Sequence, residues 1–460
     1  MSDPSQFRWR WLLPLLFFEA YLALTIALFF WGPWPWDPAS PVLLFAYLVA
    51  AQVAIAAGYL QSWRSVERSA AAGADAAASE ERALSFLRTA VWIAWLLAIP
   101  SSLSRTGTLL PDVIEGIRNP GAVYNANFER LDAGNPFVLV EYLRLLLSPF
   151  LVGLLPVAVV YWSRMSRGLK VAGLVAIAFH LSLYMATGTN KGLADSLVSL
   201  PWLVFLGVGL GTLRLLVSTR MLLVAFAALF VAFLAFFGAG QAQRQGGAGE
   251  LGVFVAGSVT VMADRYDSIS VHMNDAQRIV YESMTRYLGQ GYSALSMAFD
   301  LEHTTTWGFG HSMFLARNAD AIFGTDHFTA GSLPGLLEQE TGWGMMSRWH
   351  SIYPWLASDV GFTGALVVLG LLAYLLGRSW GAALLGRGHW PVILCYLLLV
   401  LFFYIPANNQ VFQTAETCVA FFLVLLAWAR SARARDAAET ADTGDTDSAG
   451  AAGEVDEVRP

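Results

Sequence analysis

The chain has 460 residues, of which 56% are hydrophobic and 13% charged, about half the charged fraction that is typical of a soluble domain. Its formal net charge is −6, and it has no basic array suited to nucleic acid. Cys395 and Cys418 both fall inside apolar stretches, which argues against a disulfide framework and against a thiolate metal site. Composition therefore excludes an ordinary soluble enzyme and favours a protein embedded in a membrane.

Ten apolar stretches approach or exceed the roughly 20 residues that a helix needs to cross a bilayer. The first lacks a small-residue cleavage site, so we expect it to remain as an anchor. We predict an all-α integral membrane protein of about ten transmembrane helices with one large helical loop. The predicted spans are 11–32, 41–61, 88–104, 137–162, 171–188, 193–213, 221–239, 354–377, 390–407 and 413–429.

The basic residues that flank these stretches predict the orientation, because arginine and lysine concentrate in cytoplasmic loops. With ten spans, the flanking basic residues fall on one side: Arg8, Arg10, Arg64, Arg68, Arg82, Arg88, Arg164, Arg167, Lys170, Arg214, Arg220, Arg378, Arg387, Arg430, Arg433 and Arg435. We therefore expect a bacterial inner-membrane protein with both termini in the cytoplasm.

The predicted organisation has four parts. Residues 1–239 hold spans one to seven, 240–353 form a large periplasmic loop, and 354–430 hold spans eight to ten. Residues 431–460 are rich in Ala, Thr, Asp and Gly, a composition too polar to bury a core, and we expect them to be disordered. Within the loop, Asn274 and Gln277 form the pattern of a helix capping pair.

The end of the large loop carries polar and glycine residues in a distinctive order. Residues 348–364 are Arg-Trp-His-Ser-Ile-Tyr-Pro-Trp-Leu-Ala-Ser-Asp-Val-Gly-Phe-Thr-Gly. This segment resembles the signature of the superfamily of O-antigen ligases and oligosaccharide repeat-unit polymerases, in which these residue types mark entry into a helix. The matching positions are His350, Ser351, Tyr353, Asp359, Gly361 and Gly364.

Three further stretches extend the resemblance over about residues 180–430. Residues 307–310, Trp-Gly-Phe-Gly, are similar to the family's Gly-x-Gly turn, and residues 286–295 are similar to the polymerase segment that precedes it. Residues 188–192 form the short turn between the fifth and sixth spans, where the family commonly has an arginine and this chain has Lys191. Lysine keeps the charge but lacks the bidentate fork that suits phosphate.

The resemblance implies a glycosyltransferase C-type fold and a metal-independent, inverting glycosyl transfer without a cofactor. The implied reaction joins oligosaccharide repeat units carried on polyprenyl diphosphate, with membrane lipid and a chain-length regulator protein as further partners. The leaving diphosphate needs cationic stabilisation, and the attacking hydroxyl gains from a base such as histidine. The implied catalytic residues are His350 and Arg286, and the implied substrate-binding residues are Lys191, Arg348, Arg278, Arg105, Arg118 and Tyr353.

Structural roles remain open for each candidate. Lys191 is spaced to pair with Asp195 on one helix face, and His350 could simply pack among aromatics. Glu19, His180 and Glu416 fall inside spans, where they would either pair across helices or serve function. Glu141 and Arg144 are spaced to pair on one helix.

Other sites have weaker patterns. The loose cluster of Asp300, Glu302, His303 and His311 matches no metal-binding spacing. Gly289, Gly291, Gly308 and Gly310 are expected in turns, because no strand–loop–helix context for a nucleotide surrounds them.

Two other functions remain open. A ligase of the same superfamily would transfer a finished glycan to lipid A core or to a protein. A transporter or flippase is the alternative of another class, although neither similar halves nor broken helices are evident.

Overall fold

The computed structural model describes residues 4–71, 76–132, 134–215, 217–244, 252–302 and 304–451, and most of them are helical. The first half of the chain forms a helical bundle: α1 (Pro4–Trp31), α2 (Pro41–Gln61), α3 (Trp63–Ala71), α4 (Ala76–Thr106), α5 (Val113–Arg118), α6 (Pro120–Asp132), α7 (Val138–Leu146), α8 (Ser148–Val160), η1 (Trp162–Arg164), α9 (Arg167–Ala186), α10 (Lys191–Gly209) and α11 (Thr219–Arg244). A capping segment follows: β1 (Val253–Ala256), β2 (Val259–Met262), η3 (Ser270–His272), α12 (Asp275–Ala298), α13 (Met313–Phe323), α14 (His327–Ala330) and α15 (Leu333–Thr341). The last helices return to the bundle: α16 (Ile352–Leu384), α17 (His389–Tyr404), α18 (Gln410–Gln413) and α19 (Ala415–Ala451).

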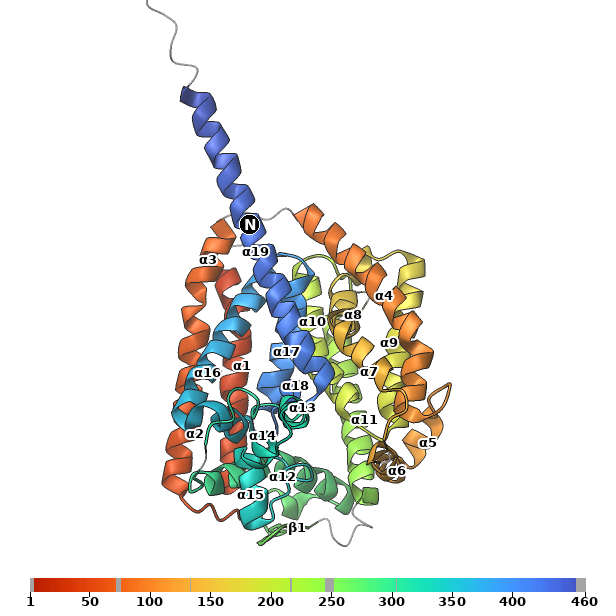
Figure 1. The fold of residues 1–460 in the computed structure, drawn as a ribbon, viewed down its shortest axis with the longest axis vertical. Helices are drawn as coiled ribbons and strands as arrows, with labels where there is room; N and C mark the ends of the chain where they lie inside the picture. Colours follow the sequence, from red (N-terminus) through yellow and green to blue (C-terminus); the bar gives the residue numbers. More distant parts are fainter. Residues whose placement is uncertain are drawn as a thin grey trace, which may run out of the picture.

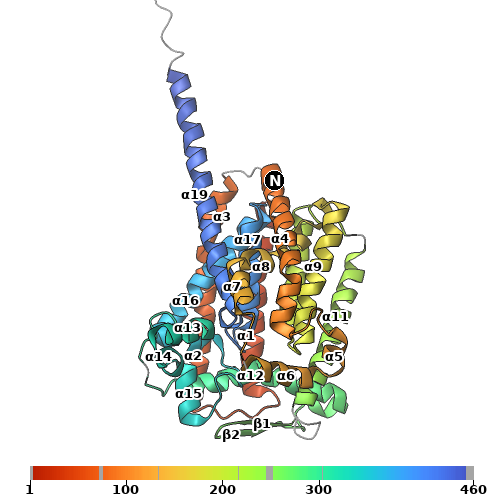
Figure 2. The same ribbon diagram turned by 45° about the vertical axis from the view of Figure 1, so that its right-hand side comes forward.

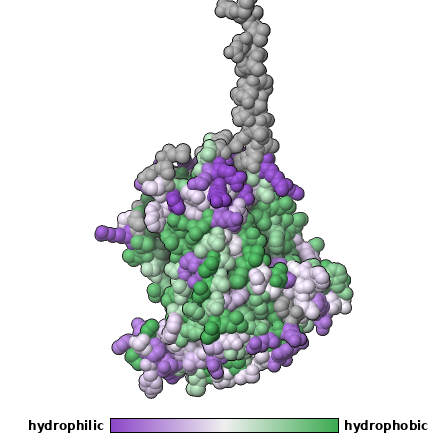
Figure 3. Space-filling model, turned by 90° about the vertical axis from the view of Figure 1, so that its left-hand side faces the viewer, coloured by the Kyte–Doolittle hydropathy of each residue, from purple (hydrophilic) through white to green (hydrophobic). Residues whose placement is uncertain are grey.

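Helices occupy all ten predicted spans. Within the described residues, eight helices are long and apolar enough to cross a membrane, and the bent pair α7 and α8 makes a ninth. The remaining predicted span is α17, which has 16 residues. The surface in Figure 3 is hydrophobic across its middle and hydrophilic at both ends. The described part of the chain is therefore that of a multi-pass membrane protein, all-α apart from one small hairpin.

We call residues 252–351 the cap, because they cover one end of the bundle. In Figures 1 and 2 the elements β1, α12 and α15 lie at this end, whereas the chain begins and α19 leaves at the opposite end. The cap is held to the loop between α1 and α2 by the Trp34 indole, which donates to the Glu282 carbonyl at 2.9 Å, and by the Asp264 amide, which donates to the Pro33 carbonyl at 2.6 Å. It is thus docked on the bundle by hydrogen bonds.

The cap is mostly helical, as predicted. Asn274 and Gln277 form a full capping box at the start of α12, which confirms the predicted capping pair. The hairpin β1–β2 was not predicted; it pairs Val253 with Met262 and turns at Gly257, whose φ of 58° suits glycine. The cap therefore combines a short sheet with its helices.

Proline and glycine break two of the long helices. Pro149, at the start of α8, has no amide hydrogen to continue the helix, and α7 and α8 meet at 58°. Gly361 interrupts α16 with φ 70° and ψ 170°, a region that only glycine adopts readily. Residues 352–360 therefore form a separate first segment of α16.

The core of the bundle joins α1, α2 and α16. The indoles of Trp11 and Trp380 are buried and donate to the carbonyls of Gly377 and Arg10, both at 2.9 Å. A Cβ on Gly58 would lie 1.9 Å from the Gly370 carbonyl oxygen, so the backbones of α2 and α16 touch. Small residues permit this close packing in membranes.

We expected residues 431–460 to form a disordered tail. Within this segment the structure describes side chains only for residues 431–433. The backbone of α19 continues to Ala451, and residues 452–460 lie outside the described residues.

Candidate functional site

Asp359 joins two of the stretches that carry the family resemblance, residues 307–310 and 348–364. Its carboxylate accepts hydrogen bonds from the amides of Gly308 and Gly310 at 2.9 Å and from the Thr306 hydroxyl at 2.5 Å. It also contacts the amide of His311 at 3.0 Å and the ring Nδ1 of His311 at 2.9 Å. The turn at 307–310 is therefore fixed to the first segment of α16. Asp359 is engaged as a structural clamp for that turn.

Of the four glycines that we expected in turns, Gly308 and Gly310 lie in one, whereas Gly289 and Gly291 do not. Gly308 does lie in a turn, with φ 87°. Gly289 and Gly291 instead lie inside α12, and a Cβ on Gly291 would come within 2.7 Å of the Ser351 amide nitrogen. The prediction of turns was wrong for these two, because glycine also permits close backbone contact. Gly291 seats α12 against the segment that carries His350, and Gly289 seats it against Trp36 and Phe29.

A cavity of about 440 Å³ lies between the cap and the bundle; we call it the cap cavity. Its walls come from α6, α12, the start of α13, the loop before α16 and the connector between α17 and α19. The lining residues are Tyr124, Tyr287, Met313, Met345, Met346, Ser347, Arg348, Trp349, His350, Trp355, Asn408 and Gln413.

His350 is the titratable imidazole in this wall. Its side chain is 1% exposed, and its ring packs edge-on against Trp355 at 6.0 Å. Nε2 lies 3.4 Å from the Gly344 carbonyl, and within the described part of the chain Nδ1 has no hydrogen-bond partner. Burial lowers the pKa of His350 to about 4, because desolvation disfavours the charged form. The imidazole is therefore neutral at neutral pH and able to accept a proton.

Arg348 lies beside His350 in the same wall. Its Nε and Nη2 donate to the Val255 carbonyl at 3.0 and 2.6 Å, and its guanidinium lies over the Phe254 ring at 5.6 Å. Among the described residues, no carboxylate lies within ion-pair distance of it. Arg348 thus ties the hairpin to the cavity wall and leaves an unneutralised positive charge there.

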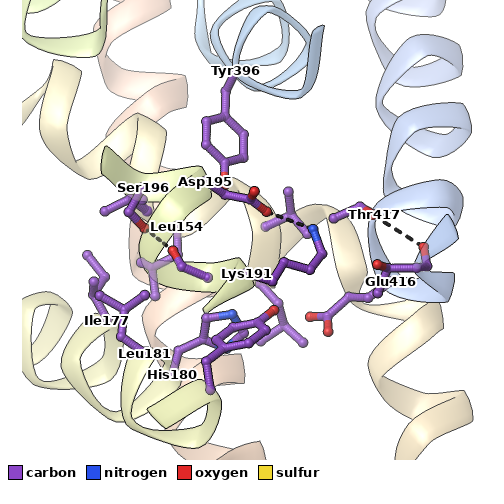
Figure 4. A pocket seen from close by; sticks show the side chains of 16 residues that line it. Leu154, Ile177, His180, Leu181, Lys191, Asp195, Ser196, Tyr396, Glu416 and Thr417 are labelled. Carbon is purple, nitrogen blue, oxygen red and sulfur yellow. Dashed lines mark hydrogen bonds and ion pairs between the residues drawn. The ribbon is translucent and has the colours of Figure 1, made fainter. Parts of the chain in front are cut away.

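A second cavity, of about 50 Å³, lies within the bundle; we call it the bundle cavity. Figure 4 shows Lys191, Asp195, Tyr396 and Glu416 around it. Lys191 donates to Asp195 at 2.7 Å, so the alternative that the two residues pair is confirmed. The lining residues are Leu151, Val152, Leu154, Leu155, Ile177, His180, Leu181, Tyr184, Lys191, Gly192, Asp195, Ser196, Tyr396, Thr414, Glu416 and Thr417.

An ion network continues from Glu416 at the wall of the bundle cavity. Arg144 Nη2 contacts both Glu416 oxygens at 3.0 and 2.9 Å, and Arg105 Nη2 contacts Glu416 at 2.9 Å. Arg105 also contacts Glu141 at 3.3 Å, and Glu141 lies 3.9 Å from Arg144. The predicted pair of Glu141 and Arg144 is confirmed. The network joins α4, α7 and α19 through alternating charges.

The two cavities lie on either side of one short segment. Asn408 and Gln413 line the cap cavity, whereas Thr414 and Glu416 line the bundle cavity. The connector between α17 and α19 therefore separates them.

The structure divides the predicted site residues into three groups. His350 and Arg348 share the cap cavity, whereas Lys191 lines the bundle cavity and Arg105 joins it through Glu416. The other candidates line neither cavity. Arg286 is buried in α12 with its guanidinium 6.0 Å from the centre of the Trp34 ring; Arg278 pairs with Asp275 at 3.3 Å; Arg118 is exposed at the end of α5; and Tyr353 packs between Tyr47 and Tyr292.

From the sequence, Arg144 was expected only to pair with Glu141, and Glu416 only to pair across helices or serve function. Asn408 and Gln413 were not predicted as site residues. A charge within an apolar stretch was the available signal for Arg144 and Glu416.

The loose cluster of Asp300, Glu302, His303 and His311 is described only in part. His311 contacts Asp359, and His303 lies outside the described residues. Among the residues that the structure describes, no group of three His, Cys, Asp or Glu side chains is placed to hold a metal ion.

Comparison with protein-family models, with curated proteins and with solved structures gives no match for this chain.

Proposed function

We propose that this protein is an oligosaccharide repeat-unit polymerase that transfers a growing glycan from one polyprenyl diphosphate carrier to the next carrier-linked unit. The observation that carries the proposal is the pair of cavities on either side of the connector. One holds a neutral histidine and an arginine beneath a cap, and the other, within the bundle, is lined by Lys191, two carboxylates and leucines. A lipid-linked diphosphate and a sugar acceptor need these two environments side by side.

The proposed donor site is the bundle cavity with its ion network. Leu154 and Leu181 give it an apolar wall, which suits a polyprenyl chain; Lys191 lies in its wall, and Arg105 is joined to that wall through Glu416. In the transfer, the acceptor oxygen bonds to the anomeric carbon while the bond to the diphosphate oxygen breaks and leaves its electron pair on that oxygen. Lys191 and Arg105 would stabilise this developing charge.

The proposed acceptor site is the cap cavity. His350 would take the proton of the attacking hydroxyl, and the aromatic rings of Tyr287 and Trp349 offer flat apolar surfaces to a sugar. A base must be neutral to act, and burial keeps His350 neutral. A diphosphate bound nearby would raise the pKa of His350, since a negative charge favours the imidazolium. Donor binding would therefore strengthen the base.

The proposal places the cap in the periplasm, with the fold of a glycosyltransferase of C type in the inner membrane. It is supported by the basic residues at the end of the bundle opposite the cap, among them Arg8, Arg10, Arg378 and Arg430, because such residues favour the cytoplasmic side.

The test uses the purified full chain in detergent with a synthetic polyprenyl diphosphate repeat unit, without nucleotide sugar and with a chelator. We expect a ladder of carrier-linked chains that is lost in His350→Ala. The matched control is His272→Ala, an exposed histidine of the cap, which should keep the ladder.

Three results would contradict the proposal. A ladder that persists in His350→Ala would remove the assigned base. Transfer of glycan to an added lipid A core or protein, with no change of chain length, would indicate a ligase. Movement of the lipid-linked unit across a vesicle membrane without transfer would indicate a flippase.

A further inference from the structure

The two guanidinium groups of the ion network differ in how firmly their carboxylates hold them. The Arg144 side chain is 2% exposed and contacts both oxygens of Glu416. The Arg105 side chain is 23% exposed and makes one contact to Glu416 and one to Glu141, which is itself 31% exposed. Arg144 is therefore more deeply buried and more fully bonded to Glu416 than Arg105 is to either of its carboxylates.

The charges around the bundle cavity are balanced. Arg105, Arg144 and Lys191 are opposed by Glu141, Asp195 and Glu416. A diphosphate that binds here must compete with carboxylates already in place. The free volume of about 50 Å³ suits only a few waters at roughly 10–15 Å³ each, so an entering diphosphate also has to displace a side chain.

We propose that Glu141 and Glu416 act as competing ligands of Arg105, which release it to the donor diphosphate and take it back when the reaction ends. This inference rests on the proposed polymerase function. The donor carries a diphosphate substituted at both ends. After transfer, the leaving polyprenyl diphosphate is substituted at one end only, so its terminal phosphate can carry one more negative charge. Two nearby carboxylates therefore repel the product more strongly than the donor, which favours product release.

The geometry supports exchange at Arg105 without collapse of the helices. Glu416 stays bound to Arg144 when Arg105 leaves. Glu141 keeps the Ser104 hydroxyl, which donates to it at 2.6 Å. The Arg130 guanidinium donates to the carbonyls of Ser104 and Arg105 and so holds the end of α4. The Arg144–Glu416 pair and the end of α4 can therefore stay in place while the Arg105 side chain moves.

The test compares Glu141→Gln and Glu416→Gln with the wild type in the polymerisation assay. The Michaelis constant is measured for the repeat-unit substrate, and the inhibition constant is measured for a short polyprenyl diphosphate without sugar. In Glu141→Gln we expect the inhibition constant to fall about tenfold, which corresponds to about 1.4 kcal/mol. The Michaelis constant should fall less, and kcat should fall because the product leaves slowly.

Glu340→Gln is the matched control, since Glu340 is an exposed acid of α15 and its loss should change neither constant. Equal changes in the two constants, or no change in either, would overturn the inference. If Glu416→Gln fails to fold because the buried Arg144 loses its ion-pair partner, Glu141→Gln still tests whether the carboxylates compete with the diphosphate. A wild type that forms no ladder would instead contradict the polymerase function itself, so the two failures are distinguishable.

Discussion

The clamp formed by Asp359 predicts a local effect of one substitution. Asp359→Asn keeps one acceptor oxygen and replaces the other with an amide group that can only donate. If the retained oxygen serves Thr306, Gly308 and Gly310, and Nδ1 of His311 carries the proton, the hydrogen bonds that break are those to the His311 amide and ring. The His311 amide then faces a donor and has no acceptor. We expect the turn at 307–310 to detach from α16 more often.

The magnitude follows from the two hydrogen bonds that break. A hydrogen bond to a charged group contributes roughly 1.5–3 kcal/mol, so removing two of them should reduce the local opening free energy by about 3 kcal/mol. Since about 1.4 kcal/mol corresponds to a factor of ten, the protection of these amides should fall by about a hundredfold.

Hydrogen exchange in detergent measures this opening directly. The amides of Gly310 and His311 should exchange faster in Asp359→Asn, while those of the bundle core keep their rates. Asp320→Asn is the control, because Asp320 accepts two amide hydrogen bonds elsewhere in the cap, both at 2.9 Å. It should loosen α14 and leave the turn protected. Unchanged protection of Gly310 and His311 in Asp359→Asn would refute the clamp.

Three further predictions follow from the backbone and the charges. Gly361→Ala should destabilise the protein by about 1–3 kcal/mol and lower its unfolding temperature in detergent. Gly168→Ala, where the new Cβ meets open space, should not lower the unfolding temperature. Equal unfolding temperatures for the two variants would refute the backbone strain at Gly361. Because the pKa of His350 is lowered to about 4, the acidic limb of kcat/KM should lie near pH 4, with activity kept above it and lost as pH falls through it; a limb near the unperturbed value of about 6.5 would mean an exposed histidine. Lys191→Ala leaves the Asp195 carboxylate buried without its ion-pair partner, at a cost of about 3 kcal/mol; adding Asp195→Asn should restore folded yield but not polymerisation, and recovery of both would assign Lys191 a structural role alone.

Hydropathy predicted the helices well because lipid forces every backbone group in a span to bond within its own segment. Local patterns also succeeded where both partners lie within one turn, as for Asn274 with Gln277 and Lys191 with Asp195. The bend between α7 and α8 was missed because a window of hydropathy does not register Pro149.

The division of the site residues could not be predicted from the sequence. The resemblance grouped His350 with Lys191, but the connector of residues 405–414 separates their cavities, and only tertiary packing decides that. Arg286 and Arg348 are both arginines of the predicted large loop. The structure nevertheless buries Arg286 against Trp34 and places Arg348 in the wall of the cap cavity. The α12 glycines Gly289 and Gly291 were expected in turns because the residues they contact, Trp36 for the first and Ser351 for the second, are remote in sequence.

The length of α17 has a consequence for where the two cavities lie in the bilayer. Sixteen residues at about 1.5 Å per residue reach about 24 Å, less than the hydrocarbon thickness of about 30 Å. Any tilt shortens that reach further. If α17 starts at one surface of the membrane, the chain turns back at residues 405–414 while still below the opposite surface. The connector, with Asn408, Asn409, Gln410 and Gln413, then forms a polar floor several ångströms inside the hydrocarbon layer, below the level of the lipid headgroups.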